Sequence, residues 1–269
     1  MIEKISVRYG DDDAFTGHLF HPTKAKTPLP AVVVIQEAWG VDVHIEDVAR
    51  RVAMAGYAAF AVDVFARDGE RPPLLTNERC AEAKAFFDRL TPQQMIDPDE
   101  RAKAMESEPE PLRTRLRESV RAIFTTAAAG ETNLPPLLAA TKWLREKCDV
   151  TRGQKIASVG FCMGGALSAL LACHDPELAA AVIFYGMSPR EELVAKLACP
   201  VLGLYGATDA RINKSLPAFV AATTKHGKSF EHYVYEAAGH AFFNDTRATY
   251  DVRAARDAWV RTLAMFHEQ

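Results

Sequence analysis

The sequence predicts a single α/β domain in which a mostly parallel sheet is covered by helices on both faces. Strand-like segments alternate with helical segments over most of the 269 residues, a pattern typical of this class. Residues 31–36 (AVVVIQ) are rich in β-branched side chains, as expected of a strand buried on both faces. The length suits one domain, and 48% hydrophobic with 25% charged residues exclude a disordered chain.

The elements follow in order along the chain. Two short alternating runs, residues 2–9 and 14–21, are expected to pair as a hairpin. Further strands are predicted at 31–36, 58–64, 155–161, 179–185, 201–205 and 230–235. Helices are predicted at 44–55, 163–174, 189–197, 213–226 and about 250–267. The last helix has its apolar residues at i, i+3, i+4 spacing, which indicates a packing face.

Residues 91–130 interrupt this alternation. They contain many charged residues of both signs and no strand pattern, which predicts a helical insertion. The insertion is either a solvated excursion on the surface or a cap beside the functional site, because insertions in open α/β sheets often follow the carboxyl ends of strands. Nothing else in the sequence indicates a second domain.

Composition and charge narrow the range of partners. The formal charge is −3, from 32 basic and 35 acidic residues without a basic block, so nucleic acid is not an expected partner. The first residues lack the apolar core of a signal peptide, and the apolar runs are too short to cross a membrane. Five cysteines without metal-binding spacing favour a reducing, cytoplasmic setting. The sequence leaves a monomer or a dimer open.

The most informative segment is IASVGFCMGG, residues 156–165. It has the pattern G-x-C-x-G between a strand and a helix, which predicts a nucleophile elbow with Cys162 in the nucleophile position. Gly160 and Gly164 lack the Cβ atoms that would clash in so sharp a turn. The turn would place the thiol at a helix N-terminus, which favours a thiolate. The alternative is a buried cysteine that only packs.

Two later residues complete a constellation. Asp209 follows the strand at 201–205, and His240 follows the strand at 230–235. Nucleophile, acid and histidine in this order are typical of α/β-hydrolases. Histidine can take and return a proton near neutral pH, and an aspartate orients its ring. Alone, Asp209 could cap a helix and His240 could lie in a surface loop; with Cys162 they predict a catalytic triad.

The loop after the first buried strand supplies further candidates. In this fold one oxyanion-hole N–H comes from that loop and one from the residue after the nucleophile. We therefore assign these roles to the backbone N–H groups of Ala38 and Met163. Glu37, which precedes Ala38, is either a surface acid or a partner of the Cys162 thiol.

Four segments carry a resemblance to a known family: GFCMGG, QEAWG, GATDA and AGHAFFND. With them, nearly the whole chain resembles the dienelactone hydrolases (carboxymethylenebutenolidases). The resemblance implies an α/β-hydrolase fold, a triad of Cys162, His240 and Asp209, and cleavage of a small ester or lactone without a metal or organic cofactor. It also implies that Glu37 holds the resting thiol neutral until substrate binds.

The expected substrate contacts depart from the family. Enzymes that act on dienelactone follow the catalytic histidine with Ser and place an Arg three residues later; here these positions are Ala241 and Asn244. Arg79 is a candidate for a further substrate-binding arginine, and Trp39, Ala241 and Phe242 are further candidates for substrate contacts. We therefore expect weaker activity on dienelactone than on neutral esters.

Two other functions stay open. One is a general thiol esterase of another substrate class, and the other is a non-catalytic ligand-binding protein with this fold. A binding protein has no need of a nucleophile, acid, base and Glu37 together, which argues against the second.

Overall fold

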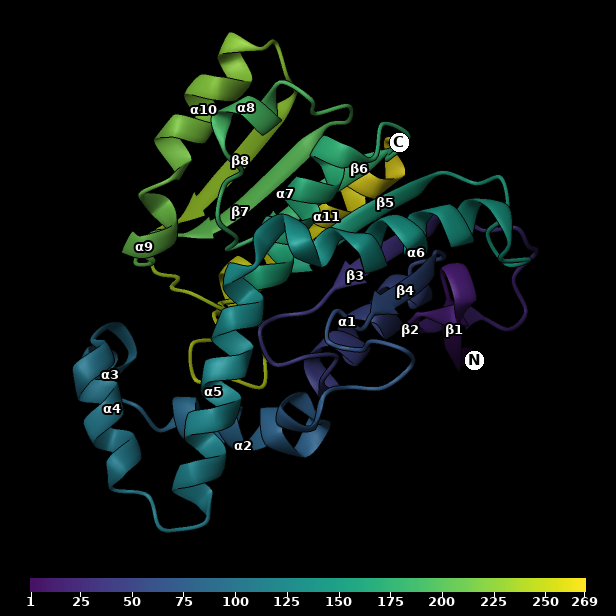
Figure 1. The fold of residues 1–269 in the computed structure, drawn as a ribbon. Helices are drawn as coiled ribbons and strands as arrows, with labels where there is room; N and C mark the ends of the chain where they lie inside the picture. The colour runs from purple at the N-terminus through teal and green to yellow at the C-terminus, as the bar shows by residue number, and fades with distance from the viewer.

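The computed structural model describes residues 1–269, apart from the side chains of Pro92 and Ile96. Its centre is one eight-stranded sheet with the order β1-β2-β4-β3-β5-β6-β7-β8 (Figure 1). β2 pairs antiparallel with β1 and with β4, and the other neighbours are parallel. The predicted α/β fold with a mostly parallel sheet is confirmed.

The strands lie close to their predicted positions. They are β1 (Ile2–Tyr9), β2 (Phe15–Pro22), β3 (Ala31–Ile35), β4 (Ala58–Val62), β5 (Ile156–Phe161), β6 (Ala180–Phe184), β7 (Val201–Gly206) and β8 (Phe230–Tyr235). β1 and β2 form the expected hairpin. β4 ends two residues before the predicted end, because the Asp63 side chain accepts the N–H groups of Phe65 and Ala66 and turns the chain.

The α-helices of the domain are α1 (Val43–Met54), α2 (Asn77–Asp88), α3 (Pro92–Ile96), α4 (Pro98–Glu106), α5 (Leu112–Ala128), α6 (Leu134–Glu146), α7 (Met163–His174), α8 (Glu191–Val194), α9 (Ala210–Asn213), α10 (Leu216–Lys225) and α11 (Val252–His267). The helix predicted at 189–197 is reduced to α8. The one predicted at 213–226 corresponds to α10, which starts at Leu216 because Pro217, which has no N–H, suits the first turn of a helix. The short helix α9, which Asp209 caps, precedes it and was not predicted.

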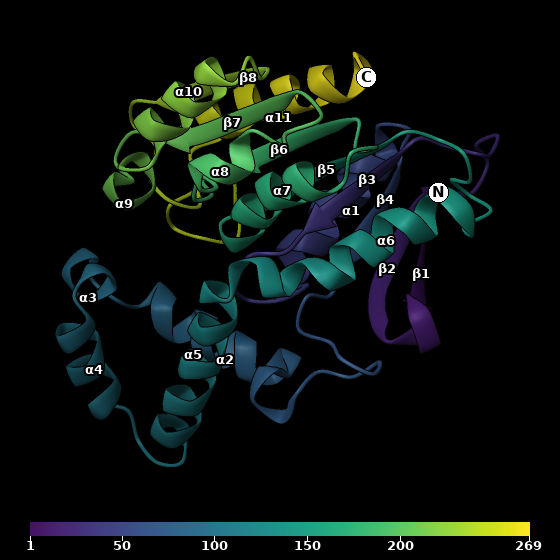
Figure 2. The same ribbon diagram turned by 45° about the horizontal axis from the view of Figure 1, so that its top comes forward.

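Helices cover both faces of the sheet (Figures 1 and 2). Val33 and Ile35 of β3 belong to one apolar cluster with residues of α6, α7 and α10. Val32 and Val34 belong to the other, with residues of α1 and α11. Side chains alternate between the faces of a strand, so a strand buried on both faces is apolar throughout.

A helical unit stands beside the sheet (Figures 1 and 2). Residues 91–130 form α3, α4 and α5, but the unit begins earlier, with α2. Arg115 of α5 makes a bidentate ion pair with Glu82 of α2, and Arg79 of α2 bonds Glu118 of α5 at 2.8 Å. Among the helices that the structure describes, none combines the length and apolarity needed to cross a bilayer.

Candidate active site

Cys162 lies at the junction of β5 and α7, in a backbone conformation that few residues adopt. Its φ is 55° and its ψ is −112°. A Cβ on Gly160 would lie 1.8 Å from the carbonyl oxygen of Gly164, and a Cβ on Gly164 would lie 2.3 Å from that of Ile35. Only glycine therefore fits on either side of the cysteine, as a nucleophile elbow requires.

Positive φ values also occur at two other residues of this region. Tyr185, after β6, has a φ of 39°, and Ala241, next to His240, has a φ of 62°. Such non-glycine conformations cost about 1–3 kcal/mol each and tend to gather at functional sites. The positive φ values of Cys162, Tyr185 and Ala241 therefore indicate a functional site where these residues lie.

Asp209 and His240 meet although 31 residues separate them. The Nδ1 atom of His240 lies 2.5 Å from Oδ2 of Asp209, whose Oδ1 accepts the N–H of Ile212 at the start of α9. The Asp209 side chain is 6% exposed, whereas the His240 side chain is 30% exposed. The loops after β7 and β8 therefore present the histidine and bury the acid that orients it.

The electrostatics of His240 depend on both of its neighbours. Burial alone would lower its pKa. The negative charge of Cys162, hydrogen bonds to Asp209 and Cys162, and the charge of Asp209 outweigh burial and raise the pKa to about 10. The imidazole thus lies between a carboxylate and a sulfur atom, and its protonated form is favoured when both are negative.

A cavity of about 450 Å³ opens beside Cys162. Ala38 and Met163 line it with the cysteine. Met163 is the first residue of α7, so its N–H has no acceptor within the helix. Other walls come from Phe124 and Ala127 of α5, from the loop after β6, and from α8 and α9. The helical unit therefore contributes directly to the cavity through α5.

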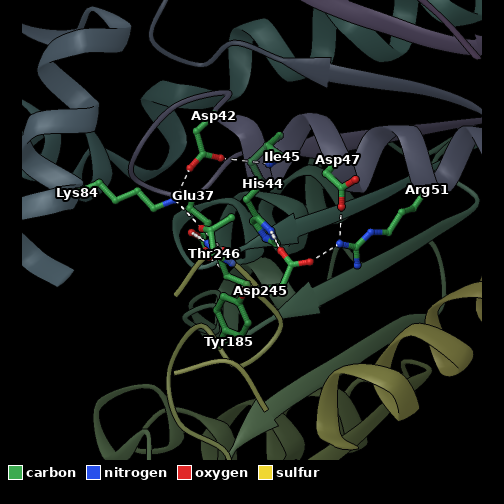
Figure 3. A network of polar contacts seen from close by, with 11 residues as sticks. Glu37, Asp42, His44, Ile45, Asp47, Arg51, Lys84, Tyr185, Asp245 and Thr246 are labelled. Atoms are coloured by element: carbon green, nitrogen blue, oxygen red, sulfur yellow. Dashed lines mark hydrogen bonds and ion pairs between the residues drawn. The ribbon is translucent and has the colours of Figure 1, made fainter. Parts of the chain in front are cut away.

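Glu37 is 2% exposed, which excludes its interpretation as a surface acid. The Tyr185 hydroxyl donates a hydrogen bond to its Oε1 at 3.1 Å (Figure 3). The Asn244 amide donates to its Oε2 at 2.9 Å. Burial and the charges of Glu37 and Cys162 raise the pKa of Tyr185 well above its usual value, so the phenol stays a neutral donor. Two neutral groups therefore hold the carboxylate in place.

This cluster extends to helix α2. Thr246 donates its N–H and its hydroxyl to Oδ1 of Asn244, at 3.1 and 2.7 Å. The ammonium of Lys84, on α2, bonds the Thr246 hydroxyl at 3.0 Å and the Asp42 carboxylate at 2.7 Å (Figure 3). Asp42 caps α1 by accepting the Ile45 N–H. The position of Glu37 is thus tied to both α1 and α2.

The candidate substrate-binding residues lie elsewhere than expected. Ala241 and Phe242 are 3% and 0% exposed, and both belong to the apolar cluster that includes residues of α1 and α11. Trp39 is 7% exposed and packs against Phe87, with ring centroids 5.3 Å apart. The Arg79 guanidinium bonds Ser119 and Glu118 of α5. The structure therefore packs these four side chains rather than presenting them in the cavity.

The other cysteines differ from Cys162. Cys80, Cys148, Cys173 and Cys199 are buried, whereas Cys162 is partly exposed. Burial raises the pKa of Cys80 to about 11 and those of Cys173 and Cys199 to about 12. Cys162 is thus the thiol best placed to react. Within the described part of the chain, no three His, Cys, Asp or Glu side chains gather as a metal site.

Sequence reasoning missed Tyr185 and the role of Asn244. Tyr185 ends a predicted strand, where an aromatic residue reads as core, and it reaches Glu37 across 148 positions. Asn244 was noticed only as the replacement of an arginine, yet it is fully buried and hydrogen-bonded to Glu37. A polar residue inside the apolar segment AFFND was the one available signal.

Known proteins are similar to this chain over nearly its full length. The model of the dienelactone hydrolase family matches residues 15–269. A Saccharolobus solfataricus protein provisionally named carboxymethylenebutenolidase is 32% identical over 237 residues, 88% of either chain. An Escherichia coli K12 protein with the same provisional name is 31% identical over 259 residues, 92% of this chain and 80% of the relative. A Klebsiella pneumoniae crystal structure, provisionally described as a dienelactone hydrolase, is 30% identical with a TM-score of 0.70, covering 100% of this chain and 99% of the other. The chain therefore belongs to the dienelactone hydrolase family of α/β-hydrolases.

Proposed function

We propose that this hydrolase cleaves a small ester or lactone by acyl transfer through Cys162, with His240 and Asp209 completing a triad. The observation that carries the proposal is the position of His240, which bonds Asp209 at 2.5 Å and has its pKa raised by the adjacent Cys162. An imidazole in contact with both an acid and a thiol can move a proton between the reacting groups. The membership in a hydrolase family adds support.

The acylation step begins with a thiolate at Cys162 and a protonated His240. The sulfur attacks the carbonyl carbon, and the oxygen that becomes negative accepts hydrogen bonds from the N–H groups of Met163 and Ala38. The carbon–oxygen bond to the leaving group then breaks, and His240 gives its proton to the departing oxygen. An alcohol, or the hydroxyl of the opened lactone, and a thioester on Cys162 result.

The deacylation step reverses these roles. Neutral His240 takes a proton from water, whose oxygen attacks the thioester carbon. The carbon–sulfur bond breaks, the acid leaves, and the thiolate and protonated imidazole are restored. Asp209 holds the ring in position throughout and stabilises its charged form.

Both the site and the names of the relatives support the proposed substrate class. A cavity of about 450 Å³ accommodates a small molecule. The provisional name carboxymethylenebutenolidase, which the relatives bear, describes a lactone hydrolase, and a lactone is an internal ester that the same two steps would open. We propose small esters and lactones as the substrates, with dienelactone one member to be tested.

Replacement of the nucleophile tests the proposal. Cys162→Ala should lower kcat/KM for 4-nitrophenyl acetate at least about 10³-fold, because no group remains to form the thioester. Cys162→Ser should also be far weaker than wild type, since a hydroxyl ionises much less readily than a thiol. Cys148→Ala is the matched control, because it removes a buried thiol outside the site, and it should keep its activity.

A second measurement separates an enzyme from a binding protein. Wild type should release one equivalent of nitrophenol in a burst, and prior treatment with iodoacetamide should abolish it. Wild-type activity in Cys162→Ala would overturn the nucleophile assignment. The absence of turnover on every ester and lactone of a panel, with ligand binding intact, would favour the binding protein.

A further inference from the structure

The cavity beside Cys162 is apolar over most of its surface but contains three charged residues. Its apolar walls come from alanine, leucine, isoleucine, methionine, proline and phenylalanine side chains of α5, α7, α8, α9 and the loop after β6. The charged residues are Glu131, Arg190 and Arg211. Their pairing decides which charge the cavity offers to a ligand.

Two of these charges compensate each other. The Arg190 guanidinium lies 2.7 Å from Oε1 of Glu131, whose Oε2 lies 3.4 Å from Nε2 of His174. Within the part of the chain that the structure describes, no carboxylate pairs with Arg211. The cavity therefore carries one uncompensated positive charge, on Arg211.

The backbone of Arg211 is fixed relative to the reactive groups. Arg211 lies in α9, which begins directly after Asp209, and the buried Ile212 next to it anchors this short helix. The Asn213 amide donates hydrogen bonds to the carbonyl oxygens of Gly206 and Ala207, at 2.8 and 3.2 Å. The backbone from which the Arg211 side chain extends is therefore held in place, two residues from Asp209, which bonds His240.

We propose that Arg211 is a specificity-determining residue that binds an anionic group of the substrate. The substrate would be an ester or lactone with a short apolar body and a carboxylate, so this inference rests on the proposed function. Arginine can bind a carboxylate through two parallel hydrogen bonds. Arg211 is exposed, so water partly screens the pair and a modest effect on affinity is expected.

This inference revises the expectation that neutral esters are preferred. That expectation rests on Ala241 and Asn244 at the positions of a Ser and an Arg, with Arg79 as the candidate arginine. The side chains of Asn244 and Arg79 are hydrogen-bonded to other protein groups. Arg211 supplies a cation on a different wall, close to α5 and α8. An anionic group would therefore be bound on the α9 side of the cavity.

A matched pair of substrates tests the role of Arg211. 4-Nitrophenyl butyrate and mono-4-nitrophenyl succinate share a leaving group and differ in whether the acyl chain ends in a methyl group or a carboxylate. Arg211→Met should lower the ratio of kcat/KM, succinate over butyrate, roughly 5- to 30-fold, the range of a charge-assisted hydrogen bond at a partly exposed site. Arg211→Lys should keep most of the ratio, because it keeps the charge.

Lys214→Met is the matched control. Lys214 follows α9, is exposed, and is not a lining residue of the cavity, so its removal changes the net charge equally without removing a contact. Its ratio should stay within about twofold of wild type. An unchanged ratio in Arg211→Met, or an equal fall in Lys214→Met, would overturn the proposal. Equal losses on both substrates in Arg211→Met would also overturn it, because they would show that Arg211 only positions Asp209.

Binding without turnover distinguishes this inference from the proposed function. N-phenylsuccinamate and N-phenylbutyramide are amide counterparts of the two esters, and their affinity can be measured calorimetrically with Cys162→Ala. Adding Arg211→Met should weaken binding of the succinamate roughly 5- to 30-fold and leave the butyramide unchanged. If this result were found and Cys162→Ala still hydrolysed esters at the wild-type rate, the proposed mechanism would be contradicted, but the anion site at Arg211 would be supported.

Discussion

Two buried carboxylates of the candidate site, Asp209 and Glu37, have different surroundings. Asp209 bonds the imidazole of His240, an ionisable partner that is 30% exposed. Glu37 bonds the Tyr185 hydroxyl and the Asn244 amide, which are neutral and fully buried. The same functional group thus has a titratable partner at Asp209 and neutral, buried partners at Glu37.

The difference separates a carboxylate that bonds an ionisable group from one that neutral groups hold in place. The charge of Asp209 helps raise the pKa of His240, so that pair can hold or release a proton beside Cys162. Glu37 belongs to a network that continues through Thr246 to Lys84 of α2 (Figure 3). Displacing it would break hydrogen bonds in a buried region, where an unpaired polar group costs about 1–3 kcal/mol.

The largest effect should come from the carboxylate with the ionisable partner. Asp209→Asn should lower kcat/KM for 4-nitrophenyl acetate by roughly 10²- to 10⁴-fold, because an amide cannot stabilise the imidazolium or fix the ring in the required tautomer. Asp245→Asn is the matched control, since Asp245 bonds Arg51 near the same cluster. It should stay within about twofold of wild type, as is usual for partly exposed ion pairs. Equal losses of kcat/KM in Asp209→Asn and Asp245→Asn would contradict a special role for the carboxylate that bonds His240.

A smaller effect is expected at the anchored carboxylate. Glu37→Gln should increase the rate at which iodoacetamide alkylates Cys162 near pH 7 by about 3- to 10-fold, because a neutral amide no longer opposes a nearby thiolate. Turnover should fall at the same time, since the anion held by Tyr185 and Asn244 is lost. The measurement is alkylation rate against pH, and its midpoints belong to Cys162 and His240 jointly.

Glu268→Gln, an exposed change near the C-terminus, is the control and should leave the profile as it is. If Glu37→Gln changed neither alkylation nor turnover, Glu37 would have a structural role only. The chain would then work as a plain Cys–His–Asp hydrolase.

The smallest effect concerns stability at alkaline pH. The pKa of His240 is raised to about 10 in the folded chain, against about 6.5 in an unfolded one. The native state binds this proton more tightly, so its stabilisation is complete below pH 6.5 and is lost as the pH rises through 10. Between pH 7 and 10.5 the free energy of unfolding should therefore fall by about 1–2 kcal/mol more in wild type than in Cys162→Ala.

Urea titrations of both proteins across this range provide the measurement. The titratable groups that the two proteins share cancel in the difference. Parallel curves would mean that Cys162 does not raise the pKa of His240, and the contrast between the two carboxylates would lose its electrostatic basis.

Some of the site could be predicted from the sequence because it is encoded locally. The apolar strand, the two glycines around Cys162 and the following small-residue helix specify the turn within ten residues. Asp209 and His240 could be proposed because each directly follows a recognisable strand, and parallel strands bring their carboxyl ends to one edge. The alternation of elements likewise predicted the mostly parallel sheet, whereas the starts of α9 and α10 depended on capping by Asp209 and on Pro217.

Tertiary structure alone decided the surroundings of these residues. Glu37 finds its partners 148 and 207 positions away, and no local pattern specifies a contact at such separations. From the sequence, Arg79 was a candidate substrate contact. In the fold α2 packs against α5, and Arg79 forms hydrogen bonds with Ser119 and Glu118 instead. No sequence pattern distinguishes Arg211, which the fold places on the cavity wall without a carboxylate partner among the described residues. The sequence determines which chemical groups are present and how the backbone turns at each, but packing between distant segments determines which charges are compensated and which stay available to a ligand.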